Sequence, residues 1–205
     1  MTALPDVPTS PKGPASTSPA GPPAGPSDEA LLARTAARDD DAFAALYQRW
    51  SAPVMAFAYH LTYDRGLAED VVQETFLRVW RFAGGFREGG RFGPWVLQIA
   101  RRLVYDRAGP WRRGRGFGGD AVDASPAPAE GAEAGATARR EEIADGVREA
   151  LLSLTEPLRE TFVLVRLCGA TYPGAAEALE VPVGTVKSRM AAAEAALRAR
   201  LARFL

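Results

Sequence analysis

The residues best suited to chemistry are a run of arginines with aromatic neighbours in the middle of the chain. Between Arg81 and Arg115 nine basic residues face only two acidic ones, which leaves a local charge of +7. The whole chain of 205 residues has a formal net charge of zero. Guanidinium groups bind phosphates. One strongly basic segment in a neutral chain indicates a localised contact with a polyanion.

The sequence gives little support for a disulfide, a metal site or a catalytic nucleophile. The chain has one cysteine, Cys168, and one histidine, His60. This excludes an intramolecular disulfide and a zinc site with several Cys and His ligands. A Cys–His nucleophile pair stays formally possible, but both residues lie in apolar helical patterns, where packing is the commoner role. We therefore expect no catalytic residue, no metal and no cofactor, and we do not expect an enzyme.

The length allows one ordinary domain or two small ones, and a hydrophobic content of 47% is enough to build their cores. No apolar run approaches the ~20 residues that span a membrane. The N-terminus also lacks the apolar core of a signal peptide. The expected location is the cytoplasm.

One predicted helix is central to the organisation of the chain. The segment Leu67–Phe82 contains neither Gly nor Pro, and its apolar residues recur at helical spacing on one face. The other face is polar, with Trp80 set in it. Two interpretations stay open for that face. It is either a solvated surface with an ion pair between Glu74 and Arg78, or an interface, since an indole among carboxylates is a common interface composition.

The same segment resembles the polymerase-docking helix of bacterial RNA polymerase sigma factors of the sigma-70 family, extracytoplasmic-function (ECF) subfamily. The match runs from Leu67 to Trp80, LAEDVVQETFLRVW. In the family, this helix holds the clamp helices of the polymerase β′ subunit. The resemblance implies that Phe76 and Val79 belong to the core. It also implies five residues that bind core polymerase: Asp70, Gln73, Glu74, Leu77 and Trp80.

Composition divides the chain into four parts. Residues 1–27 are rich in Pro, Ser and Ala and are predicted to form a disordered tail. Residues 28–108 and 141–205 have helical patterns, and residues 109–140 are a Gly-, Pro- and Ala-rich flexible linker. The predicted fold class is all-α, with two small helical domains. The resemblance implies that these domains are sigma region 2 and the sigma region 4 helix-turn-helix.

Local signals predict where the first helices begin and end. Ser27 is a candidate N-cap for a helix over residues 30–38. A second helix begins near Asp39–Asp41, and Pro53 is expected to break or kink it near Ser51 because proline removes a backbone donor.

The basic segment itself comprises a glycine-rich loop over residues 83–90 and an amphipathic helix, Trp95–Arg107. In the family, these two elements capture the −10 promoter element by holding a flipped base and gripping the separating strands. The resemblance implies six −10 DNA-binding residues: Arg87, Arg91, Phe92, Trp95, Arg101 and Arg102. For Trp95 alone, a place in the core explains the residue at least as well. Arg102 stands where the family often has asparagine, so no −10 sequence is predicted.

The C-terminal part reads as a helix-turn-helix. A helix over Glu156–Cys168 precedes a short helix that is capped by Thr171 and ends at Leu179, and Pro182 opens a long final helix. The segment Val181–Arg189, VPVGTVKSR, resembles the −35-reading segment of the same family, which enters the major groove. The implied −35 DNA-binding residues are Thr185, Lys187, Ser188 and Arg189.

Three positions in this part depart from the family. Pro173 and Gly174 replace residues that are commonly acidic, so the capping box on Thr171 loses its reciprocal bond. Glu180 occupies a turn where glycine is frequent, which costs on the order of 1 kcal/mol if that turn needs a positive φ. The stretch Met190–Ala196 lacks the arginines usual on this helix, which predicts weak DNA affinity.

The predicted function is that of a sigma factor that directs core RNA polymerase to promoters and helps to open the −10 region. The expected partners are the polymerase β′ clamp helices and β flap, and promoter DNA, with an anti-sigma factor left open. The alternative is a stand-alone helix-turn-helix regulator with a helical sensor domain. The docking-helix motif Leu67–Trp80 separates the two, because a plain repressor does not require it.

Overall fold

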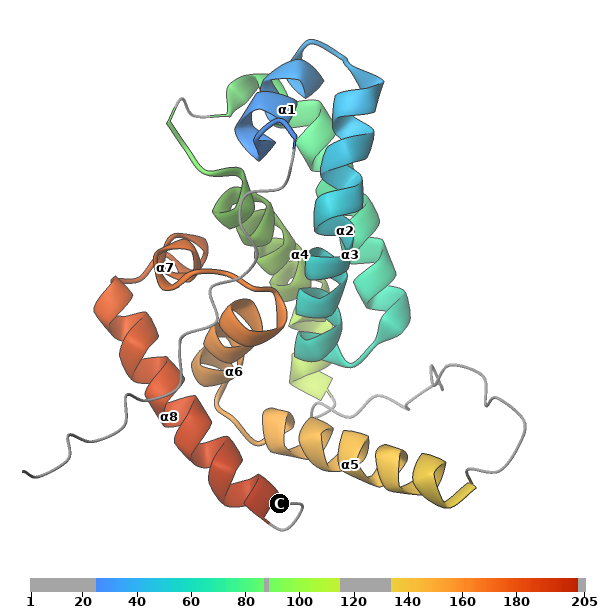
Figure 1. Cartoon of the computed structure of the whole chain (residues 1–205), viewed down its shortest axis with the longest axis vertical. Helices are drawn as coiled ribbons and strands as arrows, with labels where there is room; N and C mark the ends of the chain where they lie inside the picture. The colour runs from blue at the N-terminus through green and yellow to red at the C-terminus, as the bar shows by residue number, and fades with distance from the viewer. Residues whose placement is uncertain (1–24, 87–88, 115–133, 203–205) are drawn as a thin grey trace, which may run out of the picture.

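The structure is a computed structural model and describes residues 25–86, 89–114 and 134–202. Within these ranges the chain is helical and contains no β-strand (Figure 1). The predicted all-α fold class is confirmed. No helix in the described ranges is long and apolar enough to cross a membrane. The predictions for residues 1–24 and 115–133 lie outside the described residues.

The N-terminal half is built from four α-helices, α1 (Asp28–Ala36), α2 (Asp40–Thr62), α3 (Arg65–Phe82) and α4 (Phe92–Gly114), with a short 3-10 turn, η1 (Ala83–Gly85), after α3. They pack around a common core (Figure 1). Large side chains buried there include Leu32, Leu46, Val54, Phe57, Val71, Val79, Phe92 and Val96.

Side-chain caps fix the starts of these helices. The Ser27 hydroxyl accepts a hydrogen bond of 3.2 Å from Ala30 N, so the predicted N-cap of α1 is confirmed. Asp64 caps α3 in the same way, with 2.9 Å between its Oδ1 and Leu67 N. The central helix therefore begins two residues earlier than its apolar pattern indicated.

The predicted break near Ser51 is wrong, because α2 continues through Pro53 to Thr62. A proline inside a helix costs about 3 kcal/mol. Beyond it, Val54, Phe57 and Leu61 keep the helical spacing and are all buried. Burying one such side chain contributes about 1.5–3 kcal/mol, so three of them outweigh the proline.

The C-terminal half contains α5 (Ala134–Leu152), α6 (Glu156–Phe162), α7 (Tyr172–Leu179) and α8 (Val183–Leu201). Between α6 and α7 lies a π-helical turn, η2 (Val163–Leu167), so the helix predicted over 156–168 changes its winding midway. The stretch predicted as a linker is helical at both ends, where α4 finishes and α5 starts.

The two halves pack against each other along α4. Figure 1 shows α7 beside α4, and an ion pair between Arg101 and Glu160 links α4 to α6. The turn η2 also contacts α2, and its residues Val163 and Leu164 are buried in the same core as the N-terminal half. The far end of the C-terminal half has a separate small core, formed by Ala150, Leu151, Leu154, Ala193 and Leu197.

Candidate functional site

The polar face of α3 is exposed along most of its length. The side chain of Asp70 is 67% exposed, Gln73 is exposed and Leu77 is 48% exposed. Phe76 and Val79 are buried on the opposite side, as predicted. The large apolar side chain of Leu77, exposed among polar ones, makes this face a candidate protein interface.

Trp80 lies at the end of this face and is held in place. Its ring packs edge-on against Phe43, with 5.1 Å between the ring centroids. The Arg38 guanidinium lies 5.1 Å from the indole centroid, and Arg38 Nη1 donates to the Trp80 carbonyl over 3.2 Å. A half-buried indole with a fixed orientation makes a rigid anchor for a partner.

Two ion pairs border the same face. The predicted pair forms, with 3.0 Å between Arg78 Nε and Glu74 Oε1. Sequence reasoning missed the second pair, between Arg107 of α4 and Asp70, in which Arg107 Nη1 lies 3.2 Å from Asp70 Oδ2. No local pattern could have shown it, because the two residues are far apart in sequence and meet only when α4 packs on α3.

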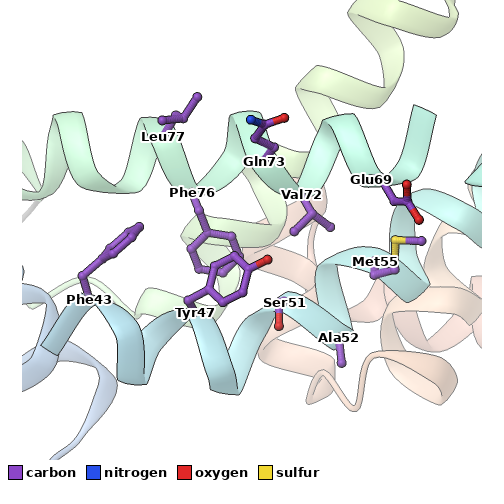
Figure 2. A pocket seen from close by; sticks show the side chains of 10 residues that line it. All are labelled: Phe43, Tyr47, Ser51, Ala52, Met55, Glu69, Val72, Gln73, Phe76 and Leu77. Carbon is purple, nitrogen blue, oxygen red and sulfur yellow. The ribbon is translucent and has the colours of Figure 1, made fainter. Parts of the chain in front are cut away.

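An apolar groove runs between α2 and α3 beside this face. It has a volume of about 510 Å³, and Phe43, Tyr47, Met55, Val72 and Phe76 form most of its wall (Figure 2). Figure 2 shows Gln73 and Leu77 on the side of α3 that points away from α2, at the rim of the groove.

The aromatic residues at the start of α4 form one cluster. Phe92 is fully buried, with its ring centroid 5.8 Å from that of Trp50 and 6.0 Å from that of Trp95. Trp95 is half-buried and also packs against Phe86, at 5.0 Å. Trp95 therefore keeps part of its surface exposed, whereas Phe92 lies completely beneath its neighbours.

Gly93 is a residue of this cluster that sequence reasoning missed. A Cβ atom at position 93 would lie 2.4 Å from the Trp50 ring, so only glycine fits there without a shift of the indole. Trp50 is held from its other side by a hydrogen bond of 2.9 Å from its Nε1 to Asp28. The glycine thus allows α4 to approach α2 closely and sets the position of Trp95.

The arginines predicted to bind the −10 element face the C-terminal half. Arg87 lies outside the described residues. The other three form ion pairs: Arg91 with Glu177, Arg101 with Glu160, and Arg102 with Glu180, at 2.9, 2.8 and 3.5 Å. Sequence reasoning missed these partners, which lie in α6, in α7 and at the end of α7, because no local pattern links them to α4.

The four residues predicted to bind the −35 element lie together in the first two turns of α8. Lys187 and Ser188 are exposed, while Thr185 and Arg189 are half-buried. The Ser188 hydroxyl donates to the Thr185 carbonyl over 3.0 Å. Val186 is fully buried and fixes this end of α8 against the domain.

Two of the positions that depart from the family lie at the ends of α7: Gly174, in its first turn, and Glu180, which follows its last turn. Thr171 still caps α7, since its hydroxyl accepts from Gly174 N over 3.1 Å. Glu180 ends α7 with φ +57°, in the left-handed region where glycine is favoured. The turn therefore needs a positive φ, and Glu180 bears the corresponding strain.

Cys168 is not an activated nucleophile. Burial raises the pKa of its thiol to about 12, so the reactive thiolate is scarce at neutral pH. The thiol donates a hydrogen bond of 3.4 Å to the Pro53 carbonyl in α2. Its role in this structure is packing between the two halves.

The described residues form an all-helical fold with an exposed polar face on α3, a basic aromatic helix and a helix-turn-helix, which places the chain in the class of helix-turn-helix proteins. Residues 46–113 match the family model of sigma-70 region 2, and residues 144–197 match that of sigma-70 region 4. The chain belongs to the sigma-70 family of RNA polymerase sigma factors, in its ECF group. It is accordingly a transcription initiation factor and not an enzyme.

Individual relatives support the assignment to the ECF sigma factors. The chain is 37% identical to the ECF RNA polymerase sigma factor SigK of Mycobacterium bovis over 186 residues, which cover 87% of this chain and 96% of that protein. SigK of Mycolicibacterium vanbaalenii is 34% identical over 83% of this chain and 87% of its own.

Two solved structures share the fold. CnrH, in complex with the cytosolic domain of CnrY, has a TM-score of 0.67 and 27% identity, covering 86% of this chain and 97% of that one. The sigma factor RpoE, in complex with the anti-sigma factor NepR from Bartonella quintana, has a TM-score of 0.55 and 26% identity, covering 72% and 89%.

Proposed function

We propose that this sigma factor binds core RNA polymerase through the exposed face of α3. The contact residues are Asp70, Gln73, Glu74, Leu77 and Trp80, and their partner is the pair of β′ clamp helices. The observation that supports this is the arrangement of exposed Asp70, Gln73 and Leu77 next to an immobilised Trp80. The Asp70–Arg107 pair would open on docking, at small cost because Asp70 is mostly solvated already.

The −10 element is assigned to the start and exposed side of α4. Arg91, Arg101 and Arg102 supply cations for the phosphates, and Trp95 supplies a surface for an unstacked base. Phe92 supports Trp95 from beneath and has no direct contact in this proposal. Arg87 stays in the proposal from its sequence position alone.

The −35 element is assigned to the start of α8. Lys187 and Ser188 are exposed there and have donors suited to base edges and phosphates, with Thr185 and Arg189 beside them. The β flap of the polymerase is the proposed partner of the same domain. We place the two domains at residues 28–108 and 141–205.

The cellular location in this proposal is the cytoplasm, where polymerase and DNA meet. An anti-sigma factor is a further proposed partner, because the similar RpoE is bound to one. The alternative of a stand-alone regulator is not favoured, because the region 2 match covers the part that such a regulator does not need.

Transcription with purified core polymerase over a library of genomic promoter fragments tests the function. The wild-type chain should produce promoter-specific transcripts that core polymerase alone does not. Lys187→Ala should weaken promoter binding by the holoenzyme and leave polymerase binding unchanged. Tight specific DNA binding without polymerase, together with no transcript in its presence, would favour the stand-alone regulator.

A further inference from the structure

Arg38 has an unusual backbone conformation in the turn between α1 and α2. Its φ is +67°, in the left-handed region that favours glycine. Arg38 N donates to the Thr35 carbonyl over 2.9 Å. Asp39 N donates to the Arg34 carbonyl over 3.2 Å. These two hydrogen bonds form the Schellman motif at the end of α1, in which the left-handed residue is usually glycine. The chain therefore carries a long, charged side chain at a position where glycine would be less strained.

The side chain of Arg38 contacts both the main chain and the ring of Trp80 in α3. Its Nη1 donates to the Trp80 carbonyl over 3.2 Å. Its guanidinium lies over the indole, 5.1 Å from the ring centroid, where the π electrons attract a cation. The carbonyl belongs to the last turn of α3, and a cation there also interacts favourably with the helix dipole. Two contacts with one residue fix the indole relative to its own backbone.

Phe43 of α2 gives the indole a second support. The ring centroids of Phe43 and Trp80 lie 5.1 Å apart, with 67° between the ring planes. Phe43 packs against the core of the N-terminal half, whereas Arg38 is exposed. The phenyl ring thus supports Trp80 from the core, and Arg38 supports it from the surface.

The carboxylate next to Arg38 in the sequence is engaged by other groups. Arg34 Nη2 lies 2.7 Å from Asp39 Oδ2. The other oxygen, Asp39 Oδ1, accepts from Ala42 N over 3.0 Å and so caps α2. The turn is therefore held on both sides by its own hydrogen bonds, and its stability does not require the guanidinium of Arg38.

We propose that Arg38 is a positioning residue for polymerase binding, which holds the indole of Trp80 in the orientation that core polymerase contacts. This rests on the proposed function of the exposed face of α3. A partner that meets a mobile side chain has to immobilise it, and holding the ring beforehand removes that cost. Arg38 precedes residues 46–113, which match sigma-70 region 2, so the turn after α1 adds this role to the matched region.

Two full-length variants, Arg38→Gly and Arg38→Ala, separate the side chain from the backbone. Both remove the guanidinium, but only glycine relieves the left-handed conformation. Because Arg38 is exposed, both variants should fold. Arg38→Gly should melt at a higher temperature than Arg38→Ala. Both should nevertheless bind core polymerase about two- to tenfold more weakly than the wild type, because the polymerase then has to immobilise the indole.

The comparison separates positioning from a purely structural role. If Arg38 acted only through stability, the affinity for polymerase would follow the melting temperature, and Arg38→Gly would bind as tightly as the wild type. That result would overturn the proposal. The matched control is Glu180→Gly, which makes the same backbone change at another left-handed residue, with φ +57°, in the C-terminal half. The control should keep the wild-type affinity, and a loss as large as that of Arg38→Gly would also overturn the proposal.

A second comparison shows whether Arg38 acts through Trp80. In the Trp80→Ala background there is no indole to orient, so adding Arg38→Gly should cause no further loss of affinity. An equal loss in the wild-type and Trp80→Ala backgrounds would overturn the positioning role, because Arg38 would then contact the polymerase itself.

The free chain provides a readout that does not involve polymerase. The sequence has four tryptophans, and each indole N–H gives one signal in a proton–nitrogen correlation NMR spectrum of the labelled full-length protein. The signal that disappears in Trp80→Ala belongs to Trp80. Arg38→Gly should shift and broaden this signal more than the other three. A Trp80 signal that stays unchanged would overturn the proposal.

Failure of the underlying function is recognised separately. If Trp80→Ala binds core polymerase like the wild type, the proposed contact through Trp80 is wrong, whatever the Arg38 variants do. If Trp80→Ala weakens binding and Arg38→Gly does not, only the positioning role of Arg38 is wrong.

Discussion

Arg101 of α4 and Glu160 of α6 form an ion pair that joins the two halves of the chain, with 2.8 Å between Arg101 Nε and Glu160 Oε1. The carboxylate is almost completely buried, whereas the guanidinium is 28% exposed. Removing the arginine therefore leaves a buried charge with less compensation, while removing the glutamate leaves a cation that still reaches water.

This asymmetry predicts unequal effects on stability. Arg101→Ala should lower the free energy of unfolding by about 1–3 kcal/mol, since a buried acceptor loses its charged donor. Arg102→Ala should cost less than about 1 kcal/mol, because its pair with Glu180 is exposed on both sides. Urea titrations followed by circular dichroism measure both values. Equal losses in the two variants would show that the Arg101–Glu160 pair has no special part in stability.

The exposed face of α3, which we propose as the contact with core polymerase, gives a second prediction. Asp70→Ala combined with Gln73→Ala should weaken binding to core polymerase at least tenfold and change the melting temperature little, because both side chains are exposed. The matched control is Gln48→Ala with Asp145→Ala, which removes the same two groups from exposed positions on α2 and α5. Fluorescence anisotropy with labelled protein gives the affinities. A double variant that binds like its control would exclude this face.

The left-handed turn at Glu180 gives a third prediction. With φ +57°, a residue with a Cβ is disfavoured there by on the order of 1 kcal/mol relative to glycine. Glu180→Ala and Glu180→Gly both lose the exposed pair with Arg102, but only the glycine variant relieves the backbone. Glu180→Gly should therefore be more stable than Glu180→Ala by about 1 kcal/mol. Thermal melts of the two variants compare them directly, and a more stable alanine variant would refute the strain.

His60 gives the protein a pH-dependent stability. Burial lowers the pKa of its imidazole below 6.5, because the charged form loses hydration, and no described residue forms a hydrogen bond with its buried Nδ1. The unfolded chain binds the proton more readily, so stability is full above about pH 6.5 and falls as the pH drops below it.

The measurement is the difference in melting temperature between pH 7.5 and pH 5.5, in wild type and in His60→Gln. The wild type should lose more than the variant, which has no imidazole to protonate. The acidic side chains titrate lower and are common to both proteins, so they cancel in the comparison. An equal loss in both proteins would assign the pH dependence to other groups.

The sequence alone determined the helices and the two motifs, because these depend on neighbours within a few residues. The apolar spacing of residues 67–82 marked α3 and its buried residues Phe76 and Val79. The caps Ser27 and Thr171 were also recognisable, since an N-cap acts on a backbone amide three residues away. The family itself could be read from two short segments in the correct order.

The tertiary structure decided which of the implied site residues are accessible and what they touch. Phe92 and Trp95 look alike in the sequence, but the approach of α4 to Trp50 buries one and leaves the other within reach. Pro53 breaks helices in isolation, yet packing of the residues after it carries α2 onward. Both outcomes depend on burial, which a local pattern does not specify.

The ion pairs of the α4 arginines that we propose for DNA binding show most clearly what the sequence could not determine. Arg91 and Glu177 are 86 residues apart, and Arg102 and Glu180 are 78 apart. The basic character of α4 was visible as a local charge of +7, but charge along a chain does not show which carboxylates will meet it. That depends on how α7 packs on α4 and on where α6 places Glu160, both of which are decided only when the two halves have folded.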